Sequence, residues 1–366
     1  MVLATLWTTG AQAGDITPLQ PGIETVGDAE WAAHDRENVK HEGYLERWMT
    51  FVERDDGGWM QISMVLTNFG PGDENAVIDV LRFAPPYTDP AAPIAYGRYP
   101  RKYPKGTWSL ERSGRFRLRA GACDLQRTAT GWTLKGTTWS TELELTATLV
   151  EPGWKPGNGR IGLPEGHVLS YAMLAGKVRI EGRERLLEGT WRPFKGTGFG
   201  EHGLSTMLPY QLADRWVRLD GRAGPYRVHF VEVTLTPKLG SERHGWLLVM
   251  KDGKVVASSL EATAKVLESK RDPVEPHHAV PMRYSVTAKT RDGPVALEVA
   301  LGRLAYREDL LQVLPAAVRS FISMFLQPMN YFFRARLSLT LPGGATASGK
   351  NAWAVFSPLR AGRQMR

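Results

Sequence analysis

The chemistry that this sequence can support centres on an acid followed directly by a histidine, Glu201-His202, in the stretch WRPFKGTGFGEHGLSTM (residues 191–207). A carboxylic acid in apolar surroundings has a raised pKa and can protonate an alkene, while a nearby histidine can position water. Chemistry of this kind needs no cofactor. The pair therefore predicts a catalytic couple or, alternatively, polar groups that hydrogen-bond the backbone freed by a bulge.

Glu201 and His202 are neighbours on a predicted strand, so their side chains point to opposite faces. They enter one pocket only if a β-bulge intervenes. Three glycines, at positions 196, 198 and 200, precede the pair and favour such a bulge. The other histidines show no ligand spacing with His202, so the sequence predicts no metal site and no cofactor.

The next long strand, PYRVHFVEV (residues 225–233), brings three more polar side chains into consideration. Tyr226 and Glu232 share one face of that strand, and His229 lies on the other. All three join the acid–histidine pair as candidate catalytic residues.

Predicted strands must position these side chains. They are read from segments that alternate apolar and polar residues and are separated by turn signals. Residues 44–52 and 59–67 form a predicted hairpin, and KDGK at residues 251–254 predicts another tight turn. The long helical crossovers that a parallel sheet needs are missing from the pattern. The sequence therefore predicts an all-β protein, built as a barrel or a sandwich.

A segment rich in glycine and proline, residues 150–166, divides the predicted strands into two groups of similar size. We predict an N-terminal β domain over residues 30–155 and a C-terminal one over residues 156–366. One apolar helix is predicted over residues 307–333. It either packs on a sheet, or acts as a lid or a membrane-touching helix that admits an apolar ligand.

Residues 1–29 are predicted to be a signal or disordered segment. MVLATLWTTGAQA is a short apolar run that ends in the small-x-small pattern of a secretory cleavage site. This pattern predicts a periplasmic or exported protein, with a cytoplasmic location as the alternative. No other segment reaches the roughly 20 apolar residues that span a bilayer.

Charge and motif content exclude several classes of function. The net charge of the 366 residues is +8, and the basic residues are scattered along the chain. Scattering disfavours nucleic-acid binding and leaves peripheral contact with anionic lipid open. GTGFGEHG is followed by no helical run, so it is not a dinucleotide loop, and no G-x-S-x-G elbow occurs.

Two stretches resemble the lipocalin-like superfamily of carotenoid 1,2-hydratases (hydroxyneurosporene synthases), which also includes tocopherol cyclases, Diels–Alderases and survival-factor proteins. YLERWMTFVERDDGGWMQISMVLTNFGPG is similar to the opening hairpin of that superfamily. LAGKVRIEGRERLLEGTWRPFKGTGFGEHGL carries G-x-G-F-x-E-H, which resembles the motif G-x-x-Y-x-D-H-x-W. The resemblance implies two tandem lipocalin-like antiparallel β-barrels.

The function that the resemblance implies is a cofactor-independent hydratase, isomerase or cyclase. Its substrate would be an apolar isoprenoid, polyene or polyketide-like molecule held within or between the barrels. Leu204 replaces the tryptophan of the motif, so an aromatic wall suited to a cation is missing. This departure weakens the case for hydration more than for cyclisation, which needs only shape. The candidate ligand-binding residues are Trp191, Phe199, Leu204, Trp216 and Phe230.

Two further hypotheses remain open. The survival-factor branch suggests a non-catalytic carrier of a lipid or another apolar small molecule. A third hypothesis is an interaction module whose barrels are filled by side chains. An enzyme needs a buried ionisable group that opens onto its cavity, whereas the cavity of a carrier is lined by apolar groups alone.

Overall fold

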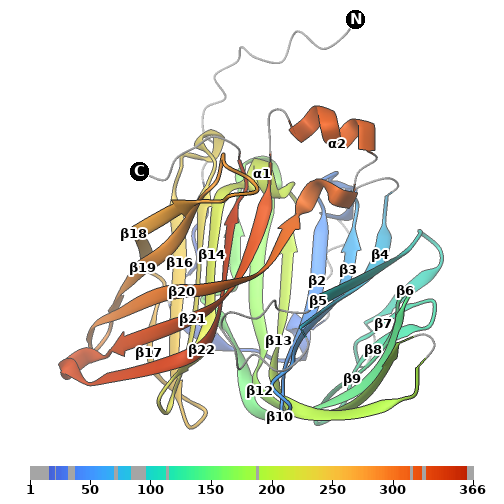
Figure 1. The fold of residues 1–366 in the computed structure, drawn as a ribbon, viewed down its shortest axis with the longest axis horizontal. Coiled ribbons are helices and arrows are strands. Elements are labelled where there is room, and N and C mark those ends of the chain that lie inside the picture. The colour runs from blue at the N-terminus through green and yellow to red at the C-terminus, as the bar shows by residue number, and fades with distance from the viewer. Residues whose placement is uncertain are drawn as a thin grey trace, which may run out of the picture.

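The structure is a computed structural model that describes residues 16–20, 22–31, 38–69, 73–83, 96–112, 115–186, 189–313, 316–323 and 327–360. Antiparallel strands dominate the described chain and form two large sheets (Figure 1). The prediction of an all-β protein is therefore confirmed. The first 15 residues, which contain the predicted cleavage site, lie outside the described ranges.

The first sheet has 13 strands, in the order β5-β4-β3-β2-β13-β12-β10-β9-β8-β7-β6, with β1 paired to β10 and β11 to β12. Its strands are β1 (Ile23–Thr25), β2 (Leu45–Arg54), β3 (Trp59–Thr67), β4 (Asn75–Phe83), β5 (Tyr96–Tyr103), β6 (Trp108–Glu111), β7 (Arg117–Ala120), β8 (Cys123–Arg127), β9 (Gly131–Thr137), β10 (Thr141–Pro156), β11 (Arg160–Gly162), β12 (Val168–Leu186) and β13 (Arg192–Ser205). The hydroxyl of Tyr103 on β5 lies 3.5 Å from the sulfur of Cys123 on β8. The two ends of the sheet therefore approach each other and nearly close a barrel.

The second sheet has nine strands, in the order β17-β16-β15-β14-β22-β21-β20-β19-β18. They are β14 (Ala213–Ala223), β15 (Tyr226–Leu235), β16 (Arg243–Lys251), β17 (Lys254–Ser259), β18 (Ala262–Arg271), β19 (Ala279–Thr290), β20 (Gly293–Asp309), β21 (Met329–Thr340) and β22 (Thr346–Pro358). The predicted turn at KDGK joins β16 to β17, with positive φ at both Asp252 and Gly253. Two successive positive φ values suit the tight turns that match the twist of a hairpin.

The division between the two sheets falls at residues 206–212, later in the chain than the predicted limit at 155/156. The segment 150–166 does not leave the first sheet, because β12 pairs with β10 and β13 pairs with both β12 and β2. Within that segment the register between β10 and β12 shifts after Leu149. The glycines and prolines therefore accompany an irregularity inside the first sheet.

The predicted helix over residues 307–333 is much shorter in the structure. β20 continues to Asp309 and β21 begins at Met329, so the helix α2 covers only Ala316–Ser323. Proline occurs at positions 315 and 328, and a proline inside a helix removes a hydrogen bond and clashes with the preceding turn. Figure 1 shows α2 beyond the upper rim of the sheets.

The remaining helical elements are short. They are the α-helix α1 (Pro209–Leu212) and the 3-10 turns Asp28–Glu30, Asn38–Lys40, Pro164–Gly166, Pro237–Leu239, Leu310–Val313 and Pro342–Gly344. Within the described ranges, no helix is long and apolar enough to cross a membrane.

Each sheet encloses a core of its own, and a third core lies where the two sheets face each other. This inter-sheet core contains Phe51, Trp59 and Phe199 from the first sheet and Trp246, Phe332 and Trp353 from the second. The rings of Trp59 and Trp353 are 4.3 Å apart between centroids. The inter-sheet face is therefore largely aromatic, and a polar group there is surrounded by apolar rings.

Candidate active site

The structure separates Glu201 from His202. β13 pairs with β2 without any shift of register, so the two side chains point to opposite faces, and both are buried. The expected irregularity exists, but it lies opposite β13, on β12, between Met173 and Val178. The two residues of the pair consequently belong to two different polar clusters.

His202 points into the core of the first sheet. Its Nε2 lies 2.7 Å from Oε1 of Glu46, and the hydroxyl of Tyr44 donates to Oε2 of the same carboxylate at 2.5 Å. The indole of Trp48 stacks on the imidazole, with 4.9 Å between ring centroids. Leu204, a candidate ligand contact, is buried in this same core. His202 thus belongs to a packed interior.

Glu201 points the other way, toward the second sheet. Its Oε1 accepts hydrogen bonds from the hydroxyl of Tyr171 at 2.8 Å and from Nη2 of Arg218 at 2.6 Å. Its Oε2 is buried and has no hydrogen-bond partner among the described residues. Burying a carboxylate oxygen without a hydrogen-bond donor costs free energy. This atom therefore marks a position where the donor group of a bound molecule can hydrogen-bond.

Tyr171 connects Glu201 to a histidine of the second sheet. The phenol oxygen lies 2.8 Å from Nε2 of His229, and Nδ1 of His229 lies 3.2 Å from Oδ2 of Asp220. Tyr171, Glu201, His229 and Asp220 therefore form a continuous chain of ionisable groups across the interface. We call this set, together with Arg218, the inter-sheet network.

The inter-sheet network has two proton arrangements. When the hydroxyl of Tyr171 donates to Glu201, Nε2 of His229 must carry the proton of the second hydrogen bond. With Nδ1 also donating to Asp220, the ring is then an imidazolium. When His229 is neutral and protonated at Nδ1, the phenol donates to Nε2 instead. The positions of the heavy atoms are therefore compatible with either direction of the hydrogen bond between Tyr171 and His229.

Neighbouring charges and burial set the protonation states of Asp220 and Tyr171. Burial raises the pKa of Asp220, but the ion pair with Arg227 at 3.0 Å and the contact with His229 outweigh it and lower that pKa to about 2. Burial and the charge of Glu201 raise the pKa of Tyr171 well above its usual value. Asp220 is thus a permanent anion and Tyr171 a neutral phenol, which keeps its proton and donates it in a hydrogen bond.

Arg47, on β2 opposite Gly203, adds a positive charge on the first sheet. Its side chain makes no hydrogen bond or ion pair with the described residues. Burial and the charge of Arg218 lower the pKa of Arg47, while Glu201 raises it. Two guanidinium groups therefore act on the single carboxylate of Glu201.

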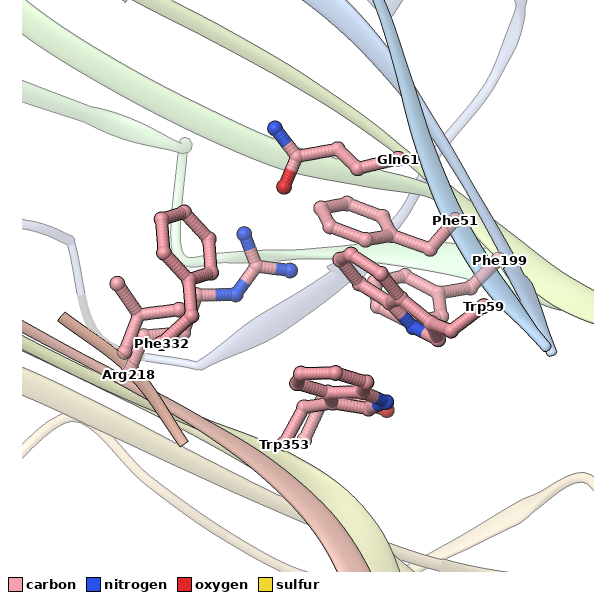
Figure 2. Close-up of a pocket in the computed structure, with 9 residues that line it drawn as sticks. Phe51, Trp59, Gln61, Phe199, Arg218, Phe332 and Trp353 are labelled. Carbon is pink, nitrogen blue, oxygen red and sulfur yellow. The ribbon is translucent and has the colours of Figure 1, made fainter. Parts of the chain in front are cut away.

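A narrow cavity adjoins this network between the two sheets. It has room for little more than a single water molecule and is lined by Phe51, Trp59, Gln61, Phe199, Arg218, Asp220, Phe332, Trp353 and Val355. Figure 2 shows the guanidinium of Arg218 in the space between Phe332 and the ring of Phe51. That guanidinium is 4.4 Å from the centroid of Phe51. Arg218 and Asp220 thus belong to both the cavity wall and the network.

Among the candidate catalytic residues, only Glu201 and His229 meet. Tyr226 and Glu232 face the interior of the second sheet, as the alternation of β15 predicted. There Glu232 receives Arg215 at 2.6 Å and Arg243 at 2.5 Å. Glu232 is therefore saturated by ion pairs and links β15 to its neighbouring strands.

The candidate ligand contacts are scattered in the same way. Phe199 lines the cavity, and its ring stacks on Phe51 at 4.4 Å. Phe230 is buried in the core of the second sheet, and Trp216 packs against a separate apolar cluster near α1. Trp191 lies at the surface beneath the guanidinium groups of Arg183 and Arg185.

Sequence reasoning missed Tyr171, Arg218 and Asp220. A signal existed for the last two, because the R-x-D spacing in DRWVRLDG places Arg218 and Asp220 on one face of a predicted strand. Tyr171 gave no such signal, since only the pairing of β12 with β13 brings it beside Glu201. Among the described residues, no group of three or more His, Cys, Asp or Glu side chains is arranged to hold a metal ion.

Two facing antiparallel sheets with a buried acid–base network between them form this protein, and the family comparison agrees with the lipocalin-like superfamily that the sequence motifs predicted. The family model of the Svf1 family matches residues 166–350, which is half of the chain. The chain belongs to the Svf1 family. No curated protein matches the sequence significantly.

Solved structures share this fold at low sequence identity. CghA with Sch210972 aligns with a TM-score of 0.61 and 11% identity, over 88% of this chain and 90% of that one. A putative AttH from Nitrosomonas europaea aligns with a TM-score of 0.59 and 12% identity, over 94% and 99%. Kievitone hydratase from Nectria haematococca aligns with a TM-score of 0.56 and 9% identity, over 94% and 95%.

Proposed function

We propose that this protein is a cofactor-independent enzyme of the hydratase, isomerase or cyclase type. Its substrate is an apolar small molecule held between the two sheets, which we infer to be tandem lipocalin-like barrels. The observation that carries the proposal is the inter-sheet network, a buried chain of proton-bearing groups that shares Arg218 and Asp220 with an aromatic cavity. A carrier of apolar ligands has no need for such a chain.

Each member of the inter-sheet network has a role in proton transfer. Asp220 orients His229, and Tyr171 passes a proton between His229 and Glu201. In an isomerisation, one end of the network takes a proton from carbon and the network returns it at another carbon. In a hydration, the network protonates one alkene carbon. Water then bonds to the other carbon and gives its proton to the carboxylate of Glu201.

The surroundings suit both reactions. Aromatic faces from Phe51, Phe199 and Trp353 would stabilise positive charge that develops on carbon. For a cyclisation, the walls need only hold a flexible substrate in its reactive conformation. The name of kievitone hydratase and the ligand of CghA support small-molecule chemistry on this fold.

The test compares Tyr171→Phe with the control Tyr226→Phe, which makes the same chemical change inside the second sheet. The host is engineered to express the wild type or either variant, and its apolar metabolites are profiled by mass spectrometry. We expect a product with the mass of a substrate plus water, or of an isomer, in wild-type and Tyr226→Phe cells. Tyr171→Phe should lower its formation by about 10²–10⁴-fold.

A different result would favour the carrier. In that case one apolar molecule would co-purify unchanged with the wild type and both variants, and the three metabolite profiles would be identical. That outcome would contradict the enzymatic proposal and would identify the carried ligand directly.

A further inference from the structure

Two neighbouring hairpins at one end of the first sheet present large apolar side chains to solvent. Trp139 lies in the turn between β9 and β10, and 69% of it is exposed; Leu186, at the end of β12, is 50% exposed. The hairpins are adjacent because β10 pairs with β12, with Thr141 opposite Leu186. A tryptophan this exposed adds little to the core, so its place on the surface calls for a partner.

Arginines lie over the tryptophan rings at this end of the sheet. The guanidinium of Arg101 is 4.9 Å from the centroid of the Trp139 ring. Arg183 is 4.6 Å from that of Trp191, which directly precedes β13 in the second hairpin. We call this set the tryptophan tip: Trp139, Leu186, Trp191, Arg101, Arg183 and Arg185. Arg183 and Arg185 pair with glutamates of β10, whereas Arg101 makes no ion pair with the described residues.

The composition and shape of the tryptophan tip fit a lipid surface. Indole rings favour the headgroup level of a bilayer, where one edge is apolar and the other is wet. The guanidinium of Arg101 beside Trp139 suits a lipid phosphate, and the net charge of +8 attracts the whole protein to an anionic leaflet. Side chains at hairpin ends can enter between headgroups without any change in the sheet.

We propose that the tryptophan tip docks this protein on an anionic membrane surface, with Trp139 and Leu186 inserted at headgroup depth. The docking site lies on the first sheet, away from the segment 307–333 that the sequence suggested for membrane contact. The proposal is independent of the reaction at the inter-sheet network. It would place the protein where apolar molecules are most concentrated.

The experiment is co-sedimentation of the full-length protein with vesicles of phosphatidylcholine, either alone or with ~30% phosphatidylglycerol. We expect sedimentation with the anionic vesicles and release at high salt, because salt screens the attraction. Trp139→Ser should weaken binding about tenfold. Val274→Ser removes another exposed apolar side chain, which is 62% exposed and lies between β18 and β19, and this variant should bind as the wild type does.

A second pair of variants tests the charges. Arg101→Gln should weaken binding several-fold and reduce its salt dependence, whereas Arg283→Gln on β19 should have no effect. If Trp139→Ser lowers the thermal midpoint, Leu186→Ser replaces it. The proposal is overturned if the wild type does not sediment with anionic vesicles. Equal binding to neutral vesicles, or full binding by both apolar tip variants, would overturn it as well.

Discussion

Asp220 is a buried carboxylate that its neighbours keep ionised. Its two oxygens accept hydrogen bonds from Arg227 at 3.0 and 3.2 Å, and one of them contacts His229. These contacts outweigh its burial and hold the pKa at about 2. Asp220 therefore supplies a fixed negative charge next to His229, which keeps the imidazole oriented toward Tyr171.

This lowered pKa makes the stability of the protein depend on pH. The pKa of Asp220 is lower in the folded protein than in the unfolded chain. Such a carboxylate stabilises the folded state at pH values above its unfolded pKa, and this stabilisation is lost as the pH falls toward its folded pKa. We expect about 2 kcal/mol of stability to disappear between about pH 4 and pH 2. Urea unfolding across that range should show this loss in the wild type.

Asp220→Asn should remove this part of the pH dependence. The control is Asp292→Asn, which replaces an aspartate on an exposed turn and should leave the wild-type dependence intact. If Asp220→Asn and the wild type lose the same free energy of unfolding over this range, Asp220 is not the group that titrates.

At the scale of single elements, β13 is the strand that positions the network, and its glycines explain how. A Cβ atom on Gly198 would lie 1.9 Å from the carbonyl oxygen of Phe51, and one on Gly196 would lie 2.1 Å from that of Glu53. Glycine therefore allows β13 to pack directly on the backbone of β2. This packing fixes the register that aims Glu201 at the second sheet.

The two glycines on either side of Glu201 should respond differently to substitution. Gly198→Ala forces β13 and β2 apart, and we expect it to destabilise the protein by about 3 kcal/mol. Gly203→Ala serves as the control, because the nearest atom to its new Cβ would be 3.7 Å away. Thermal unfolding of both variants checks the prediction, and equal midpoints would refute the backbone-contact explanation.

At the scale of the whole molecule, the site exists only because the two sheets face each other. Glu201 and Tyr171 come from the first sheet, whereas Arg218, Asp220 and His229 come from the second. Aromatic contacts join the two sheets, among them the tilted pair of Trp59 and Trp353. The geometry of the network therefore depends on this contact between sheets.

A double-mutant cycle measures that contact. We expect Trp59→Leu and Trp353→Leu to show a coupling free energy of about 1 kcal/mol, as paired aromatic rings do. The comparison cycle combines Trp59→Leu with Trp216→Leu, which belongs to a different apolar cluster, and should be additive. An additive result for the first pair would show that the contact between Trp59 and Trp353 does not stabilise the interface.

Local sequence patterns were sufficient to predict most strands and to assign residues to the two faces of a strand. The alternation in PYRVHFVEV placed His229 opposite Tyr226 and Glu232, and the structure agrees. Alternation also required Glu201 and His202 to diverge unless a bulge intervened. The motifs around the pair identified the superfamily. The helix was mispredicted in length because its apolar pattern extends across two prolines and into β21.

Only the tertiary structure decided which side chains each strand face contacts. Tyr171 meets Glu201 through the register of β12 on β13, and His229 meets both through the packing of one sheet on the other. Period-two alternation says which side a residue takes, but a strand of the same pattern fits several neighbours and registers. The sequence alone therefore determined the strands, their faces and the family. The contact between sheets decided which of the polar residues share a site, because that contact depends on the summed packing of residues far apart in the chain.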